Sequence, residues 1–231
     1  MNGSLDDLRS GLRRVQDASH EQLRSESWLI DVLRNIGLSK DDVRNEGNLT
    51  WQHDNELLGI AQTPEQFAPA LLILKDYGIR SILDIGTWSA WNVAFMVTYF
   101  GRFADGVFAH TVDRSPNRSR EVREDPTLGR LPITYHTFNT TGPVPAGCPT
   151  SADLVFIDAG HSYDAANNDW NKFGRGGRCV FFHDVNDEPC AKQLGRSCKH
   201  LWQDLIVSKR KVELFTHPSG KPLMGIGLLL P

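Results

Sequence analysis

The stretch Ser81–Ala90, SILDIGTWSA, decides the fold of this 231-residue chain. It opens with a short apolar run and continues into an acid, a glycine and small residues. Two later stretches, Leu154–Tyr163 (LVFIDAGHSY) and Cys179–Val185 (CVFFHDV), also carry an apolar run that ends near an acid. Short apolar runs of this kind predict buried parallel strands. In open α/β sheets, ligands bind at the edge formed by the carboxyl ends of such strands.

Four polar side chains follow the second and third of these strands. They are Asp158, His161, His183 and Asp184. Carboxylates and imidazoles are metal ligands, and a histidine can also accept a proton near neutral pH. The sequence therefore predicts one metal-dependent site at this edge. Three alternatives stay open: His161 caps the following helix, His183 orients Asp184, and Asp158 contacts a cofactor instead of a metal.

The rest of the chain alternates between strand and helix. Helical spacing is found over residues 4–36, and Thr63 followed by Pro64 predicts the start of a helix that runs to Tyr77. Further strands are expected at 107–112 and 131–136, and a closing antiparallel pair at 211–217 and 223–230. Further helices are expected at 90–100, 116–124, 163–173 and 188–209. Strands separated by helices imply a doubly wound sheet.

The loop after the first strand points to the kind of ligand. It holds one glycine, Gly86, whereas a dinucleotide-binding loop requires three. Asp113 ends the next strand, where an acid can accept hydrogen bonds from a ribose diol. These features favour an adenosyl ligand without a pyrophosphate. The alternative is structural: Asp84 caps a helix and Asp113 caps a turn.

A wider set of motifs runs from about Leu57 to Val212. They are Gln62–Glu65 (QTPE), Ile82–Thr87 (ILDIGT), Val112–Asp113, Phe156–Tyr163 (FIDAGHSY), Gly176–Gly177, Phe182–Val185 (FHDV) and Leu201–Trp202. On these motifs the chain resembles S-adenosylmethionine-dependent methyltransferases of the Rossmann-like class. More narrowly, it resembles the small-molecule O-methyltransferases that include macrolide-sugar enzymes and cephalosporin-hydroxylase-like proteins.

The resemblance implies an α/β fold, a Rossmann-like seven-stranded doubly wound sheet with an antiparallel last strand. We expect residues 1–56 to form an N-terminal helical extension or lid, and residues 57–231 the methyltransferase domain. The implied ligand is S-adenosyl-L-methionine. The expected cofactor-binding residues are Gln62, Asp84, Gly86, Trp88, Asp113, Asn139 and Asp158.

The resemblance also implies catalytic and metal-binding roles. His161 and Asp158 are the expected catalytic residues, with His161 as the general base. The expected ligands of a divalent metal, magnesium or manganese, are Asp158, His183 and Asp184. Here the chain departs from the macrolide-sugar enzymes, which have an acid where His183 stands. Magnesium prefers oxygen ligands, whereas imidazole suits manganese, iron, nickel or zinc.

The function predicted from these features is metal-assisted methyl transfer to a hydroxyl of a small molecule, a sugar or a phenol. The alternatives are a metal-dependent hydrolase or oxygenase-like enzyme on the same strand ends, and a non-catalytic module that binds an adenosyl ligand. The net charge of −3 argues against a nucleic-acid partner. No apolar run is long enough for a membrane span and no signal peptide is visible, so we expect a cytoplasmic protein. The acceptor and a homo-oligomer both remain open.

Overall fold

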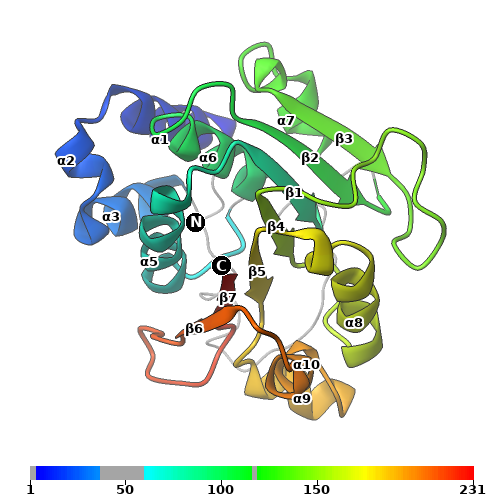
Figure 1. Cartoon of the computed structure of the whole chain (residues 1–231). Coiled ribbons are helices and arrows are strands. Elements are labelled where there is room, and N and C mark those ends of the chain that lie inside the picture. The colour runs from blue at the N-terminus through cyan, green and yellow to red at the C-terminus, as the bar shows by residue number, and fades with distance from the viewer. Residues whose placement is uncertain (1–3, 37–59, 116–118) are drawn as a thin grey trace.

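A computed structural model describes residues 4–36, 60–115 and 119–231. Within these ranges the strands form one seven-stranded sheet in the order β3-β2-β1-β4-β5-β7-β6 (Figure 1). The strands are β1 (Ser81–Ile85), β2 (Phe108–Asp113), β3 (Ile133–Thr137), β4 (Leu154–Ile157), β5 (Cys179–His183), β6 (Arg210–Leu214) and β7 (Ile226–Leu230). Strands β1 to β5 pair in parallel, and β7 is antiparallel to both of its neighbours. The predicted α/β fold with a reversed last strand is confirmed.

Helices cover both faces of the sheet, as Figure 1 shows. One layer holds α1 (Leu5–Asp17), α2 (His20–Leu23), α3 (Glu26–Ile36), α5 (Pro64–Leu74), α6 (Trp91–Phe100) and α7 (Arg120–Glu124). The other holds α8 (Tyr163–Lys172), α9 (Glu188–Leu194) and α10 (Cys198–Asp204). Single 3-10 turns follow α5, α7 and α8, at Lys75–Tyr77, Leu128–Arg130 and Gly174–Gly176. The predicted helix at 116–124 begins at Arg120, and residues 116–118 lie outside the described ranges.

The central strands are buried because helices pack on both sides of them. Every residue of β4 and β5 is buried. Phe156 of β4 and Phe181 of β5 have ring centroids 4.3 Å apart, and Phe67 of α5 contacts Phe181 at 5.8 Å. Such strands appear as unbroken apolar runs in the sequence, which is why they were predictable.

The N-terminal helices belong to the same core as the sheet. Leu8, Val15 and Val32 lie in one hydrophobic cluster with α5, α6 and the strands. Ser4 and Ser19 each form a capping box, so the broken helix expected over residues 4–36 is divided into α1, α2 and α3. The expected boundary between residues 56 and 57 lies outside the described ranges.

The helical segment predicted at 188–209 consists of two helices. The structure has α9 and α10 there, separated at Gly195, whose φ of 73° ends α9. Ser197 then caps the start of α10. The four cysteines are all buried free thiols. Among the described helices, none is both long and apolar enough to cross a membrane.

Candidate functional site

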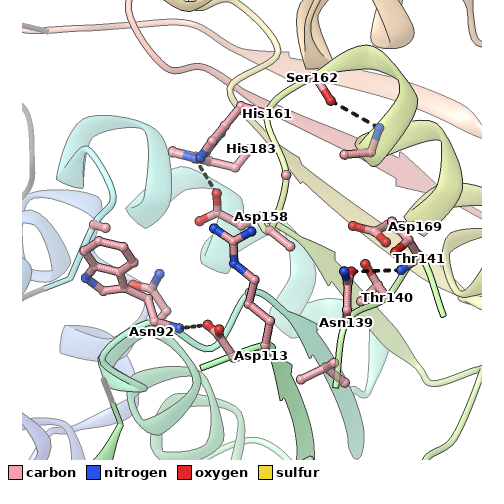
Figure 2. Close-up of a pocket in the computed structure, with 18 of the residues that line it drawn as sticks. Asn92, Asp113, Asn139, Thr140, Thr141, Asp158, His161, Ser162, Asp169 and His183 are labelled. Atoms are coloured by element: carbon pink, nitrogen blue, oxygen red, sulfur yellow. Dashed lines mark hydrogen bonds and ion pairs between the residues drawn. The ribbon is translucent and has the colours of Figure 1, made fainter. Parts of the chain in front are cut away.

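A cavity of about 460 Å³ opens at the carboxyl ends of the parallel strands. Its wall includes seven of the predicted site residues: Gly86, Trp88, Asp113, Asn139, Asp158, His161 and His183. In Figure 2, His161 and His183 lie near Asp158 on one side, and Asn139 lies with Thr140, Thr141 and Asp169 on another. The strand ends therefore come together at one edge, as the sequence pattern predicts.

The loop after β1 is a tight turn that keeps its backbone close to the cavity. Gly86 has a φ of 112°, and a Cβ at this position would lie 2.3 Å from the carbonyl oxygen of Asp158. Only glycine fits such a position. Trp88 and Ala90 follow with φ values of 46° and 68°, which are uncommon for residues with side chains. Gly86 therefore lets the loop after β1 pack directly against the backbone at the end of β4.

Asp113 is held at the cavity wall by two backbone donors. The Trp88 N–H donates to its Oδ2 at 2.9 Å, and the Ser115 N–H donates to its Oδ1 at 2.8 Å. Each carboxylate oxygen can accept more than one hydrogen bond, so capacity remains for a hydroxyl pair of a ligand. The loop after β1 therefore fixes the acid at the end of β2.

Asp84 lies deeper than the sequence motif suggests. It is 1% exposed and is not among the described residues of the cavity wall. The Thr111 hydroxyl donates to its Oδ2 at 2.6 Å, and the hydroxyls of Thr111 and Thr87 are 2.5 Å apart. Burial, together with the charges of Asp158 and Asp113, raises the pKa of Asp84 to about 7, although the hydrogen bond from Thr111 lowers it.

Asp158 sits where β1 and β4 meet. Its N–H donates to the Ile85 carbonyl at 2.8 Å, which extends the pairing of the two strands to the cavity. Gln62 donates to Asp158 Oδ2 at 2.9 Å, and His183 Nδ1 lies 3.0 Å from Asp158 Oδ1. Gln62 was predicted to bind the cofactor. It is buried and does not belong to the described cavity wall, and its side chain contacts Asp158 instead.

Asp184 and His161 form the closest acid–imidazole contact of the site. Asp184 follows β5 in a left-handed conformation, with φ of 60°, which is uncommon for a residue with a side chain and often marks a functional site. Its Oδ2 lies 2.5 Å from His161 Nδ1, and its Oδ1 lies 3.3 Å from His183 Nδ1. Asp184 is 1% exposed, and His161 is partly exposed at the cavity wall.

Three of these side chains could hold a metal ion. Ligand atoms of Asp158, His161 and Asp184 all lie within 4.8 Å of one another. This group contains His161, whereas the imidazole ligand predicted from the sequence is His183. His183 is nevertheless adjacent, since its Nδ1 contacts both carboxylates. The donor set of two carboxylates and an imidazole fits a divalent transition metal.

The backbone around His161 is fixed by the segment between α9 and α10. Cys198 N–H donates to the His161 carbonyl at 3.0 Å, and Tyr163 N–H donates to the Arg196 carbonyl at 3.1 Å. The Arg196 guanidinium lies 3.8 Å from the centre of the Tyr163 ring. Ser162 caps α8 by accepting from Ala165 N–H at 3.3 Å (Figure 2). His161 is therefore held from both sides.

Several solved structures with a similar architecture are methyltransferases. An O-methyltransferase from Bacillus cereus in complex with SAH matches over 99% of this chain and 98% of its own, with a TM-score of 0.53 and 15% identity. The O-methyltransferase TomG from Streptomyces achromogenes, involved in tomaymycin synthesis and in complex with SAM, matches over 92% and 91%, with a TM-score of 0.55 and 13% identity. The chain has a methyltransferase fold. No model of a protein family matches the sequence, and no curated protein does.

Asp169 is a wall residue that no sequence motif indicates. It lies on α8 beside the buried residues Ala166, Trp170 and Phe173. These apolar positions have helical spacing, so the sequence itself places Asp169 on the buried side of a helix. An acid on the buried side of a helix requires a polar partner or a ligand.

Proposed function

We propose that this protein is an S-adenosylmethionine-dependent O-methyltransferase that acts on a hydroxyl of a small molecule, a sugar or a phenol. The methyltransferase fold supports the reaction class. The cavity supports an extended ligand with a ribose at Asp113, and Gly86 forms part of its wall. The observation that carries the choice of a hydroxyl acceptor is the pairing of His161 with Asp184 at the cavity wall.

A carboxylate at Nδ1 prepares a histidine for base catalysis. The 2.5 Å contact with Asp184 favours the tautomer with a hydrogen on His161 Nδ1, which makes Nε2 the basic nitrogen. The buried carboxylate also stabilises the imidazolium that forms when Nε2 accepts a proton. Methyl transfer to a hydroxyl requires removal of that proton and alignment of the acceptor oxygen with the methyl group. His161 would supply the first requirement and the cavity wall the second.

A divalent cation is the second part of the proposal. Asp158, His161 and Asp184 are the residues that would hold it, with His183 beside them. When bound, a cation lowers the pKa of an acceptor hydroxyl and fixes its position. If His161 binds the cation, its role is that of a ligand and not of a base. The two roles make different predictions for the His161 variant.

The test compares His161→Ala with His20→Ala, which removes an exposed imidazole on α2. Each protein is titrated with S-adenosylhomocysteine by calorimetry and assayed for methyl transfer to a panel of sugars and phenols. For His161→Ala we expect turnover to fall by roughly 10²–10⁴-fold while the affinity for S-adenosylhomocysteine stays within about twofold. Unchanged turnover would remove His161 from the reaction. Failure of the unaltered protein to bind S-adenosylhomocysteine would overturn the methyltransferase proposal itself.

Titration with Mn²⁺, Zn²⁺ and Mg²⁺ separates the two roles of His161. Loss of metal affinity in His161→Ala would assign His161 as a ligand, whereas retained affinity would support the base. Tight metal binding in a protein that does not bind S-adenosylhomocysteine would favour a metal-dependent hydrolase or oxygenase-like enzyme, because the same three side chains would then act without an adenosyl ligand.

A further inference from the structure

A buried glutamine reaches the candidate metal group from the start of α5. Gln62 lies two residues before Pro64, and its Nε2 donates to Asp158 Oδ2 at 2.9 Å. Gln62 is 1% exposed and does not belong to the described cavity wall, whereas Asp158 is a wall residue whose side chain is 11% exposed. The amide therefore contacts Asp158 on the side that faces away from the cavity.

Three elements hold Asp158 in one orientation. Its N–H donates to the Ile85 carbonyl of β1, which fixes the backbone. On the side chain, His183 at the end of β5 lies 3.0 Å from Oδ1 (Figure 2), and Gln62 bonds to Oδ2. Each carboxylate oxygen can accept more than one hydrogen bond, so both keep acceptor capacity toward the cavity. A carboxylate held in this way can bind a cation without first losing rotational freedom.

A second glutamine, in the first turn of α5, provides a comparison within the chain. Gln66 is also buried, and both ends of its amide are bonded: Nε2 donates to the Leu223 carbonyl at 3.2 Å, and Oε1 accepts from Gly225 N–H at 3.0 Å. These bonds tie α5 to the segment before β7. The Oε1 of Gln62 has no hydrogen-bond partner among the described residues. An unbonded buried atom costs stability, so an apolar side chain would serve better if Gln62 only filled space. The bond to Asp158 therefore accounts for the amide.

We propose that Gln62 is a positioning residue, which fixes the Asp158 carboxylate for a divalent cation. This inference rests on the cation of the proposed function and extends it to a residue outside the cavity wall. A neutral donor suits this place because it orients the carboxylate and leaves its negative charge available to the cation. A lysine would neutralise that charge and repel the cation, and a glutamate would repel Asp158. Loss of a partner that bonds to a metal ligand typically weakens metal binding by about 10- to 100-fold.

The test removes the donor and keeps the shape. In Gln62→Met, an unbranched side chain of similar length fills the site without an N–H. Calorimetry with Mn²⁺ in the presence of S-adenosylhomocysteine should show an affinity about 10- to 100-fold weaker than in the unaltered protein, while the affinity for S-adenosylhomocysteine stays within about twofold. Gln16→Met, which alters an exposed glutamine of α1, should change neither affinity.

A measurement on the unaltered protein makes the test independent of the folding of the variant. Zn²⁺, which is diamagnetic, should shift the side-chain amide resonances of Gln62 in an NMR spectrum, because a bound cation draws electron density from Asp158. The resonances of Gln66 should stay in place, because both ends of its amide bond to the segment before β7. Equal shifts of the two glutamines, or no shift of Gln62, would refute the inference.

The remaining outcomes separate this inference from the proposed function. If the unaltered protein binds S-adenosylhomocysteine but neither Mn²⁺ nor Zn²⁺, the positioning role is refuted while the methyltransferase proposal stands. If it does not bind S-adenosylhomocysteine, the proposed function fails, and the Mn²⁺ titration alone decides the role of Gln62. Full Mn²⁺ affinity in Gln62→Met would show that the residue only fills space. An equal loss of affinity for Mn²⁺ and S-adenosylhomocysteine would also refute the role, since Gln62 would then support the adenosyl ligand or the fold.

Discussion

Asp84 is a carboxyl group whose surroundings disfavour its charge. It lies at the carboxyl half of β1, fully enclosed, with the Thr111 hydroxyl as a hydrogen-bond donor and with Asp158 and Asp113 nearby. In the unfolded chain a carboxyl of this type has a pKa near 3.8, whereas in the fold the pKa is about 7. Ionisation of Asp84 therefore opposes folding. The role of Asp84 therefore lies in ligand binding or in the charge of the site, and not in the stability of the fold.

Asp84→Asn tests this directly, because asparagine resembles the protonated acid. A pKa raised by folding contributes stability that is fully present below about 3.8 and is lost as pH rises toward 7. The free energy of unfolding of the unaltered protein should therefore fall relative to Asp84→Asn across this window, by up to about 1.4 kcal/mol per pH unit. Urea unfolding without ligand at several pH values gives the measurement. A difference that stays constant with pH would contradict the raised pKa.

The contacts within the site show what a sequence can and cannot reveal. The apolar runs place Asp158 and Asp184 at neighbouring strand ends, and this was predictable. The 2.5 Å contact of Asp184 with His161 depends on the left-handed backbone of Asp184, and this conformation cannot be predicted from the residue type. That the candidate metal group contains His161, with His183 beside it, likewise depends on tertiary geometry. Asp169 could have been predicted as a site residue, because the spacing of the apolar residues of α8 places it on the buried side of the helix.

At the scale of elements, one carboxylate joins α1 to the end of α7. Asp125 ends α7, and its Oδ1 accepts from Thr127 N–H and Leu128 N–H at 2.9 Å each. Its Oδ2 pairs with Arg9 of α1. Arg9 and the two backbone donors lower the pKa of Asp125 to about 2, against the effect of burial. The sequence predicts neither this ion pair nor the placement of α7 beside α1, because residues 9 and 125 are far apart in the chain.

Replacing this residue should loosen the N-terminal helix. Asp125→Ala leaves two backbone donors without their acceptor, which costs about 1–3 kcal/mol of unfolding free energy at pH 7. Asp125→Asn retains the acceptor but loses the ion pair. Because the pKa is lowered by folding, the ionic contribution is present above about 3.8 and disappears as pH falls toward 2. The gap between Asp125→Asn and the unaltered protein should close over that range, and Asp105→Ala, an exposed acid, should have little effect throughout.

At the scale of the whole molecule, the N-terminal helices and the sheet share one hydrophobic core. The hydrophobic cluster that contains Leu8 and Val32 also contains Leu228 of β7. Arg102, just beyond α6, donates to the carbonyls of Val15 and Ala18 at 3.0 Å each, which ties the end of α1 to the main fold. The expected extension over residues 1–56 therefore has described helices that pack as a layer of the fold. Amphipathic spacing predicted those helices but not the surface they cover.

This shared core predicts how a ligand changes stability. If S-adenosylhomocysteine binds the native state, a concentration of 100 times its dissociation constant should add about 2.7 kcal/mol to the unfolding free energy. Because α1 and α3 share the core of β1 and β4, amide hydrogens in all four should gain equal protection when exchange requires global unfolding. Homocysteine alone, which lacks the adenosyl group, serves as the control. Two separate unfolding transitions, or protection that rises in the strands but not in α1 and α3, would show that residues 4–36 form an independent unit whose packing does not depend on the site.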